Sequence, residues 1–294
     1  MYSALSPGAI GVRPANLIEA IAMAKHGGFG GVEFSAHEVA DLVEQQDADA
    51  VRTLFHSAGI HPAAFGLPTD WRTSDENWHR GLSELPRLAQ AAAAIGGMRT
   101  MTWIMPGSND REYEENRRHH IARFTPIATI LADNGISLGL EFIGPKTLRD
   151  GQKFPFIYTM DAMLEMGQEI SPNVGLLLDC WHWYTSHGTL ADLKRLRPDQ
   201  IAYVHVNDAP PDVPIDAQVD NVRGLPGETG VIDITGFLKS LQSIGYTGPV
   251  TPEPFQKTLS ALPDDNARLA AVGNSMRTIF ARAGIEPTIL PSTA

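Results

Sequence analysis

Eight short runs of apolar, β-forming residues recur along the chain, and segments with helical spacing lie between them. The runs cover residues 9–12, 31–34, 60–65, 98–104, 137–142, 174–179, 201–206 and 249–253. Helical spacing is clearest over residues 82–95 and 121–131, where apolar residues repeat at intervals of three and four. Eight strands alternating with helices over about 250 residues are typical of a (β/α)8 barrel. We therefore predict an α/β fold, a single (β/α)8 TIM barrel with a C-terminal helix.

A doubly wound open sheet is the alternative fold, but it normally carries a glycine-rich first turn. Here the first run continues as Val12-Arg13-Pro14-Ala15-Asn16, without a G-x-G-x-x-G motif. The glycines of residues 27–31 come between an expected helix and the next strand, so we interpret them as a helix stop and a turn. No shift in composition marks a linker. We expect one barrel domain over residues 1–286, followed by a frayed C-terminal tail over residues 287–294.

The charge and cysteine content disfavour several classes of protein. The 294 residues include 23 Lys and Arg against 34 Asp and Glu, a net charge of −11, which disfavours nucleic acid because phosphate backbones attract basic surfaces. The single cysteine cannot form an internal disulfide. Residues 88–98 fall far short of the roughly 20 apolar residues of a membrane helix, and residues 1–5 lack the basic start of a signal peptide. We expect a cytoplasmic protein with a small-molecule partner, no nucleic acid and no membrane.

Four of the expected strands end in a residue that can bind a metal ion: Glu141, Asp179, His205 and Glu253. In a (β/α)8 barrel the C-terminal strand ends share one face, where the active site forms. A carboxylate beside an apolar run costs several kcal/mol unless it is paired or bound to a cation, and no Lys or Arg occupies the equivalent strand ends. Three carboxylates and an imidazole suit a divalent cation. We predict one divalent metal ion at these four residues, Mn²⁺ by preference, with Mg²⁺, Co²⁺ or Zn²⁺ as alternatives.

Two further residues are candidates for substrate contacts. His182 follows Asp179 by three residues, where it can hydrogen-bond a substrate hydroxyl or, alternatively, stack on Trp181. Arg223 closes a loop that begins after His205 and that carries four aspartates and no Lys or other Arg. Barrels commonly hold phosphate in the loops after their last strands. Because so acidic a loop is a poor phosphate cradle, we expect an unphosphorylated substrate.

Two aromatic residues stand at the ends of earlier strands. Phe65 ends the run 60–65, and Trp103 stands near the end of the run 98–104. Each can stack on a sugar ring as a substrate contact or pack into the core, and the sequence does not separate these readings. Cys180, beside Asp179, has no evident base next to it, so we interpret it as buried and inert.

These residues lie in short motifs that together resemble the xylose isomerase-like TIM barrel superfamily, whose members include sugar phosphate isomerases and epimerases and endonuclease-IV-type nucleases. The motifs are Gly139-Leu140-Glu141-Phe142, Leu178-Asp179-Cys180-Trp181-His182, Val204-His205-Val206-Asn207-Asp208, Arg223-Gly224-Leu225-Pro226-Gly227, Gly230-Val231-Ile232-Asp233 and Pro252-Glu253-Pro254-Phe255. The resemblance covers nearly the whole chain and is strongest from residue 136 onward. Within the superfamily the chain looks most similar to keto-inositol isomerase-like and ketose 3-epimerase-like members.

The resemblance implies a role for each of these site residues. It implies metal ligands at Glu141, Asp179, His205 and Glu253, and substrate contacts at His182 and Arg223. It also implies that the two glutamates are the catalytic acid/base pair. The implied enzyme is a divalent-metal-dependent isomerase or epimerase that acts on an unphosphorylated keto-sugar or inosose. Such an enzyme abstracts the proton alpha to the carbonyl through a metal-stabilised enediolate.

Two other functions remain as alternatives. A metal-dependent lyase or dehydratase acting on a 3-keto sugar or glycoside would share the first proton abstraction and then expel a β-leaving group. An endonuclease-IV-type nuclease needs three zinc ions and therefore more ligands, but Phe65 and Trp103 stand where further ligands would be wanted. The sequence does not identify the sugar, and it leaves a homodimer or homotetramer open.

Overall fold

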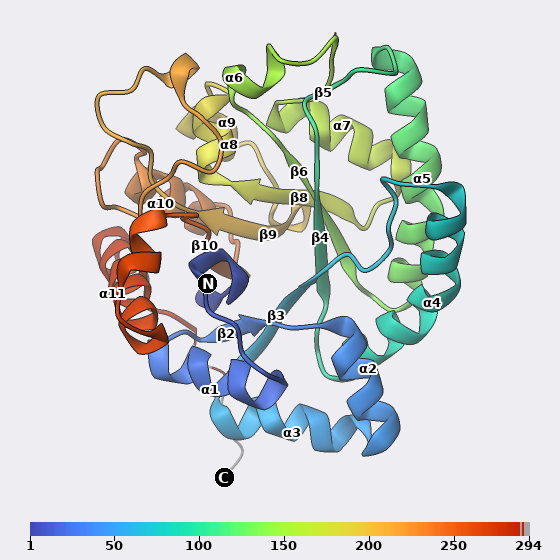
Figure 1. The fold of residues 1–294 in the computed structure, drawn as a ribbon, viewed down its shortest axis with the longest axis vertical. Helices are drawn as coiled ribbons and strands as arrows, with labels where there is room; N and C mark the ends of the chain where they lie inside the picture. The colour runs from blue at the N-terminus through green and yellow to red at the C-terminus, as the bar shows by residue number, and fades with distance from the viewer. Residues whose placement is uncertain (289, 291–294) are drawn as a thin grey trace.

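The computed structural model describes residues 1–288 and 290, and it contains a closed barrel of eight parallel strands (Figure 1). Around the barrel the strand order is β1-β10-β9-β8-β6-β4-β3-β2. The strands are β1 (Tyr2–Leu5), β2 (Gly31–Glu33), β3 (His61–Gly66), β4 (Arg99–Ile104), β6 (Ser137–Phe142), β8 (Val174–Asp179), β9 (Ile201–Val206) and β10 (Pro249–Pro252). The predicted (β/α)8 barrel is confirmed.

The first strand is the one that sequence analysis misplaced. Residues 9–12 were expected to form it, but they overlap a 3₁₀ turn, η1 (Gly8–Ile10), and strand β1 precedes that turn. Gly11 adopts a left-handed conformation with φ of 75°, which ends the turn and which a strand residue does not adopt. Strand β1 closes the barrel because Tyr2 pairs with Pro249 on one side and Ala4 pairs with Gly31 on the other.

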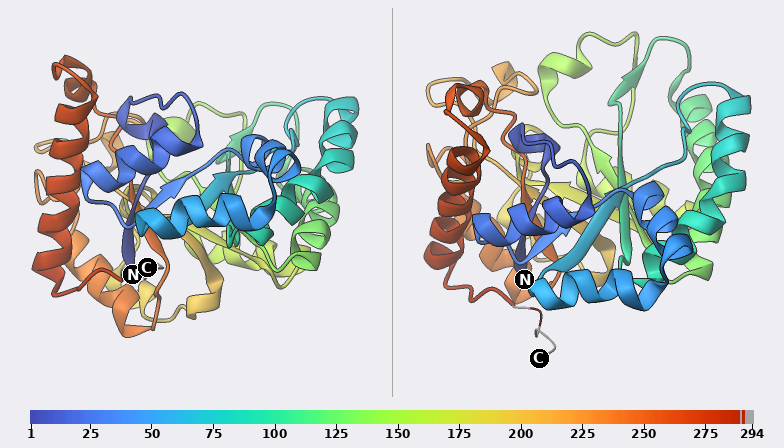
Figure 2. Two further views of the ribbon diagram at one scale, coloured as in Figure 1. Left: turned by 90° about the horizontal axis from the view of Figure 1, so that it is seen from below. Right: turned by 60° about the horizontal axis from the view of Figure 1, so that its bottom comes forward.

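Helices surround the barrel on its outside (Figure 2). The longer ones are α1 (Leu17–Gly27), α2 (Ala36–Gln45), α3 (Ala48–Ala58), α4 (Asp75–Ala94), α5 (Tyr113–Asp133), α7 (Met160–Ile170), α10 (Ile234–Ser243) and α11 (Asp265–Ala283). Short helices α6 (Lys146–Arg149), α8 (Cys180–Thr185) and α9 (Leu190–Leu193) lie in the loops. Side chains cap several helix starts: Asn16 accepts from the backbone N–H of Glu19 at 3.0 Å, and Asp233 accepts from that of Gly236 at 2.8 Å. The C-terminal helix α11 packs against α1 and α10, which completes the ring.

Alternation along the strands divides the core into two hydrophobic layers. A small cluster inside the barrel includes Tyr2, Ala4, Leu177 and Tyr203. A much larger cluster fills the space between the strands and the helices. Because side chains alternate between the two faces of a strand, the next inward positions on β8 and β9 after the small cluster are Asp179 and His205. The barrel is thus apolar in its interior and carries titratable groups at its C-terminal end.

The loops after β4 and β6 form a small antiparallel sheet of β5 (Gly107–Ser108) and β7 (Phe154–Pro155) beyond the C-terminal strand ends (Figure 1). At the other end of the chain, the N–H of Thr288 donates to the carbonyl of Met1 at 3.0 Å. The frayed tail expected over residues 287–294 falls mostly on residues 289 and 291–294, which lie outside the described residues. No described helix is both long and apolar enough to cross a membrane.

Candidate metal centre

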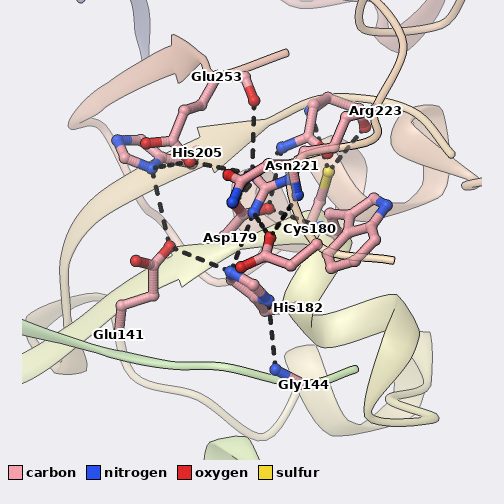
Figure 3. A network of polar contacts seen from close by, with 12 residues as sticks. Glu141, Gly144, Asp179, Cys180, His182, His205, Asn221, Arg223 and Glu253 are labelled. Carbon is pink, nitrogen blue, oxygen red and sulfur yellow. Dashed lines mark hydrogen bonds and ion pairs between the residues drawn. The ribbon is translucent and has the colours of Figure 1, made fainter. Parts of the chain in front are cut away.

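Four side chains from consecutive strands of the barrel converge at its C-terminal end (Figure 3). They are Glu141 on β6, Asp179 on β8, His205 on β9 and Glu253 just after β10, and one ligand atom from each lies within 4.8 Å of all the others. The register explains the convergence, because Asp179 pairs with His205 and His205 pairs with Thr251, two residues before Glu253. The predicted ligand set is therefore brought together in space.

The environment of these groups fits a divalent cation. Glu141 and His205 are each 5% exposed, and Asp179 is fully buried. Nδ1 of His205 lies 3.3 Å from Oε2 of Glu253 and 3.8 Å from Oε1 of Glu141. Oε1 of Glu141 and both ring nitrogens of His205 are buried without a hydrogen-bond partner among the described residues. Since an unsatisfied buried polar group costs roughly 1–3 kcal/mol, these atoms are well matched to a metal ion.

Burial and mutual repulsion also perturb the pKa values of these groups. Burial, and then the charge of Glu253, raise the pKa of the Glu141 carboxyl well above its ordinary value. Burial alone would lower the pKa of His205, but the neighbouring carboxylate of Glu253 raises it well above its ordinary value. Concentrated negative charge of this kind is what a bound cation would relieve.

Arg223, which lies in a loop and not at a strand end, partly neutralises the carboxylates of the cluster. The sequence analysis expected Arg223 to contact the substrate but did not predict these ion pairs. Arg223, in the loop after β9, donates from Nη1 to Asp179 at 2.8 Å and to Glu253 at 2.9 Å, and from Nη2 to Asp220 at 2.9 Å. Its side chain is only 2% exposed. Burial would raise the pKa of Asp179, but the Arg223 guanidinium outweighs it, and that pKa falls to about 2.

His182 on the short helix α8 lies beside the same carboxylates. Gly144 N–H approaches Nδ1 at 3.2 Å, and Nη2 of Arg223 approaches Nε2 at 3.1 Å. Burial lowers the pKa of His182 to about 4, so the ring is neutral at pH 7 and has a lone pair on only one nitrogen. Because the Gly144 N–H donates to Nδ1, the proton of the neutral ring is on Nε2, which lies 3.9 Å from Oε1 of Glu141 on the cavity side of the residue. A Cβ on Gly144 would lie 2.2 Å from the carbonyl oxygen of His182, so this close approach requires glycine.

A cavity of about 420 Å³ opens above the cluster. Glu141, His182, Arg223 and Glu253 line it, together with Trp103, Met105, Ile143, Leu148, Asp220, Asn221 and Phe255. Trp103 is 43% exposed and is free to contact a ligand there. The structure thus places three of the four expected substrate contacts, His182, Arg223 and Trp103, in one cavity with the two glutamates.

The fourth expected contact, Phe65, is corrected by the structure. Its side chain is fully buried, and its ring lies 5.4 Å from that of Phe34 in the layer between strands and helices. Phe65 does not line the cavity. The physical reason is an irregularity in β3: its register with β2 shifts by one residue, so Ala63 and Ala64 both belong to the inner cluster and Phe65 packs outward against the helices. Cys180 is buried as expected, and its thiol donates to the carbonyl of Asn207 at 3.1 Å.

The four aspartates of the loop after β9 do not all face the cavity. Asp208 is fully buried and accepts the backbone N–H groups of Thr229, Gly230 and Ile232 at 2.8–3.0 Å, so it anchors the loop. Asp220, which pairs with Arg223, is the loop aspartate that lines the cavity.

Glu33, at the end of β2, is a further carboxylate that the sequence analysis missed. It accepts from Ser6 Oγ at 2.7 Å and from the Tyr203 hydroxyl at 3.0 Å, and its Oε1 lies 3.9 Å from Nε2 of His205. A signal for it was present, because Gly31-Val32-Glu33-Phe34 has the same pattern as Gly139-Leu140-Glu141-Phe142.

Comparison with known proteins agrees with this fold. The family model of the xylose isomerase-like TIM barrel matches residues 21–278, and the chain belongs to that family. An inosose isomerase of Halalkalibacterium halodurans is 21% identical, with 93% of this chain and 95% of that protein covered. A xylose isomerase domain protein of Alicyclobacillus acidocaldarius has a similar structure, with a TM-score of 0.83, 29% identity and coverage of 96% of this chain and 99% of that one. The IolI protein, solved with a bound zinc atom, has a TM-score of 0.76 at 20% identity, with 96% and 99% of the two chains covered.

Proposed function

We propose that this protein is a sugar isomerase or epimerase that acts on an unphosphorylated keto-sugar or inosose. The observation that carries the proposal is the placement of two glutamates, Glu141 and Glu253, in the lining of one cavity and next to the same atom, Nδ1 of His205, which lies 3.8 and 3.3 Å from their oxygens. Two carboxylates that face one substrate can take a proton from a carbon and return one to a neighbouring atom or to the opposite face. Family membership and the inosose isomerase relative support the same class of reaction.

In this proposal Glu141, Asp179, His205 and Glu253 hold one divalent cation, with Mn²⁺ preferred. When bound, the cation supplies Lewis-acid polarisation of the substrate carbonyl. The orphaned ligand atoms of Glu141 and His205 support this assignment, as does the zinc atom in the related IolI structure. Asn207, whose amide donates to Asp179 at 3.1 Å, and Arg223 orient the Asp179 carboxylate.

The other cavity residues bind and orient the substrate. One glutamate removes the proton alpha to the carbonyl, and the other returns a proton, which gives an isomer or an epimer. The Nε2–H of His182 donates to a substrate oxygen, and the exposed face of Trp103 packs against the carbon skeleton. Arg223 is the cationic side chain that lines this cavity, and three carboxylates already engage it. The reacting end of the substrate is therefore uncharged.

Proton NMR of candidate keto-sugars and inososes in D₂O with the metal-loaded protein tests the proposal. We expect exchange of the alpha proton and the appearance of an isomer, without loss of a group. Elimination of a β-substituent would instead identify the lyase or dehydratase alternative. Absence of alpha-proton exchange with every keto-sugar and inosose of the panel would contradict the proposed function.

A further inference from the structure

A second cavity of about 210 Å³ adjoins the first, and the two share Trp103 and Met105 as lining residues. Its other walls come from the loop after β3, the β5 segment and the N-terminal half of α5. None of the proposed metal ligands lines it, and its lining residues include no Asp or Glu. It is therefore a separate cavity that meets the first one at Trp103 and Met105.

Arg72 gives this cavity a fixed positive charge. Its guanidinium is stacked between two indole rings, with Cζ 4.3 Å from the ring centroid of Trp71 and 4.0 Å from that of Trp103. Nη2 donates to Thr102 Oγ1 at 3.0 Å, while Nε and Nη1 have no hydrogen-bond partner among the described residues. Arg72 is exposed as a residue, but partial burial of its guanidinium lowers its pKa to about 10 while the charge of Asp70 acts in the opposite direction, so the group stays protonated at pH 7. Neighbouring Asp70 forms no ion pair with it and instead accepts from Thr73.

Arg111 supplies a second guanidinium to the same cavity. Its side chain forms no ion pair or hydrogen bond with the described residues. Eight of the other fifteen arginines form an ion pair with a carboxylate among the described residues; Arg87, for example, contacts Asp41 and Glu44. In a chain with 34 acidic and 23 basic residues, two guanidinium groups without carboxylate partners in one cavity indicate a site for an anion.

The two histidines that line this cavity add no positive charge to it at pH 7. The ring of His120 lies with Nδ1 2.7 Å from the carbonyl of Asn116, so Nδ1 donates and Nε2 keeps a lone pair. Burial lowers the pKa of His120 to about 4 and also lowers that of His119. Both rings are then neutral at pH 7, and the two guanidinium groups carry the positive charge of the cavity. Flat indole and guanidinium walls and two forked donors suit a planar monoanion, because a carboxylate binds a guanidinium through both oxygens.

We propose that the second cavity binds a carboxylate carried by the substrate at the end remote from its reacting carbons. The inference rests on the proposed function, because it takes the first cavity as the place of the reacting carbons. It narrows the substrate class to keto-sugar acids or other acidic polyhydroxy ketones. Trp103, between the two cavities, would contact the carbon chain that joins the two ends.

Binding measurements with a matched pair of sugars test the inference independently of turnover. D-Glucuronate and D-glucose differ in having a carboxylate or a hydroxymethyl group at one end, and each is titrated calorimetrically into the full-length, metal-loaded protein. We expect wild-type protein to bind D-glucuronate about tenfold or more tightly than D-glucose, which corresponds to about 1.4 kcal/mol. Equal binding, or no detectable binding of either sugar, would contradict the proposal.

Three variants test whether Arg72 and Arg111 cause the preference for D-glucuronate over D-glucose. Arg111→Gln, which removes a group without partners, and Arg72→Gln are expected to bring the affinities for the two sugars within about twofold of each other. Arg118→Gln changes an exposed arginine of α5 that does not line the cavity, and it should keep the wild-type preference. Preference retained in both the Arg72 and Arg111 variants would overturn the assignment. Thermal unfolding verifies that each variant is folded.

Inorganic phosphate distinguishes a free anion from a substrate carboxylate. Binding of phosphate that depends on Arg111, without any preference for D-glucuronate, would show an independent anion site and overturn the proposal. The outcome also separates this inference from the proposed function. A glucuronate preference that depends on Arg111, found together with no alpha-proton exchange in any keto-sugar, would uphold the cavity and contradict the isomerase.

Discussion

Oε1 of Glu33 lies 3.9 Å from Nε2 of His205, on the side of the ring opposite to Glu253, whose Oε2 is 3.3 Å from Nδ1. The imidazole is thus held between two carboxylates, with Nδ1 toward the proposed metal ligands and Nε2 toward Glu33. Hydroxyl groups fix Glu33 in turn, because Ser6 and Tyr203 donate to it and Thr251 donates to the Tyr203 oxygen at 2.6 Å. The charge of a carboxylate on this side of the ring favours the tautomer with its proton on Nε2, which leaves the Nδ1 lone pair for a cation.

Glu33→Gln should therefore weaken metal binding. We expect the affinity for Mn²⁺, measured by calorimetric titration of the metal-free protein, to fall by about 10- to 100-fold. Glu44→Gln, which removes an exposed carboxylate paired with Arg87, is the matched control and should leave the affinity unchanged. Wild-type Mn²⁺ affinity in the Glu33 variant would show that this carboxylate does not orient His205.

Arg223→Met should destabilise the metal-free protein. The substitution leaves Asp179 and Glu253 close together without their guanidinium partner, and breaking a buried ion pair in this way costs about 3 to 5 kcal/mol. Urea unfolding measures the change, and saturating Mn²⁺ should restore part of the loss because a cation replaces the missing charge. Arg87→Met, at an exposed set of ion pairs, serves as the control and should change the stability little. A variant as stable as wild type without metal would contradict this role of Arg223.

Acidification should destabilise the protein through its buried histidines. Burial lowers the pKa of His120 to about 4, whereas an unfolded histidine titrates near 6.5. The unfolded chain therefore binds the proton first, so stability is full above about pH 6.5 and falls as the pH drops toward 4, by about 3 kcal/mol for this residue. His182, whose pKa is also lowered to about 4, adds a similar loss.

Urea unfolding of the metal-free protein at several pH values between 7 and 4 measures the free energy of unfolding at each pH. The slope of this free energy against pH is the quantity to compare between variants. His120→Gln should remove the contribution of this one histidine and so reduce the loss of stability between pH 7 and pH 4. His187→Gln, at an exposed contact with Asp216, should leave it unchanged. The same slope in wild type and in the His120 variant would show that His120 is not buried in its neutral form.

The sequence was most informative where strand alternation and register alone determine the arrangement. Glu141, Asp179, His205 and Glu253 each follow an apolar run, and parallel strands bring such ends to one level. Arg223 could be singled out from its loop, but its pairing with Asp179 and Glu253 depends on the folding of a loop of many residues, which periodicity does not determine.

Two residues in the first half of the chain also have positions that periodicity does not determine. Phe65 was assigned to either face of its strand, and the shift in register between β2 and β3, which periodicity does not predict, directs it outward. Glu33 repeats the motif around Glu141, but strand β2 is only three residues long, so its end is a weak signal. The short strand β1 was displaced to residues 9–12 for a similar reason.

The central claim is that Glu141 and Glu253 exchange protons with the substrate, and deuterium incorporation at the alpha carbon measures it directly. With a keto-sugar or inosose that wild-type protein exchanges in D₂O, Glu141→Gln and Glu253→Gln should each slow the exchange by about 100- to 10,000-fold while the protein stays folded. Wild-type exchange in either variant would contradict the acid/base assignment.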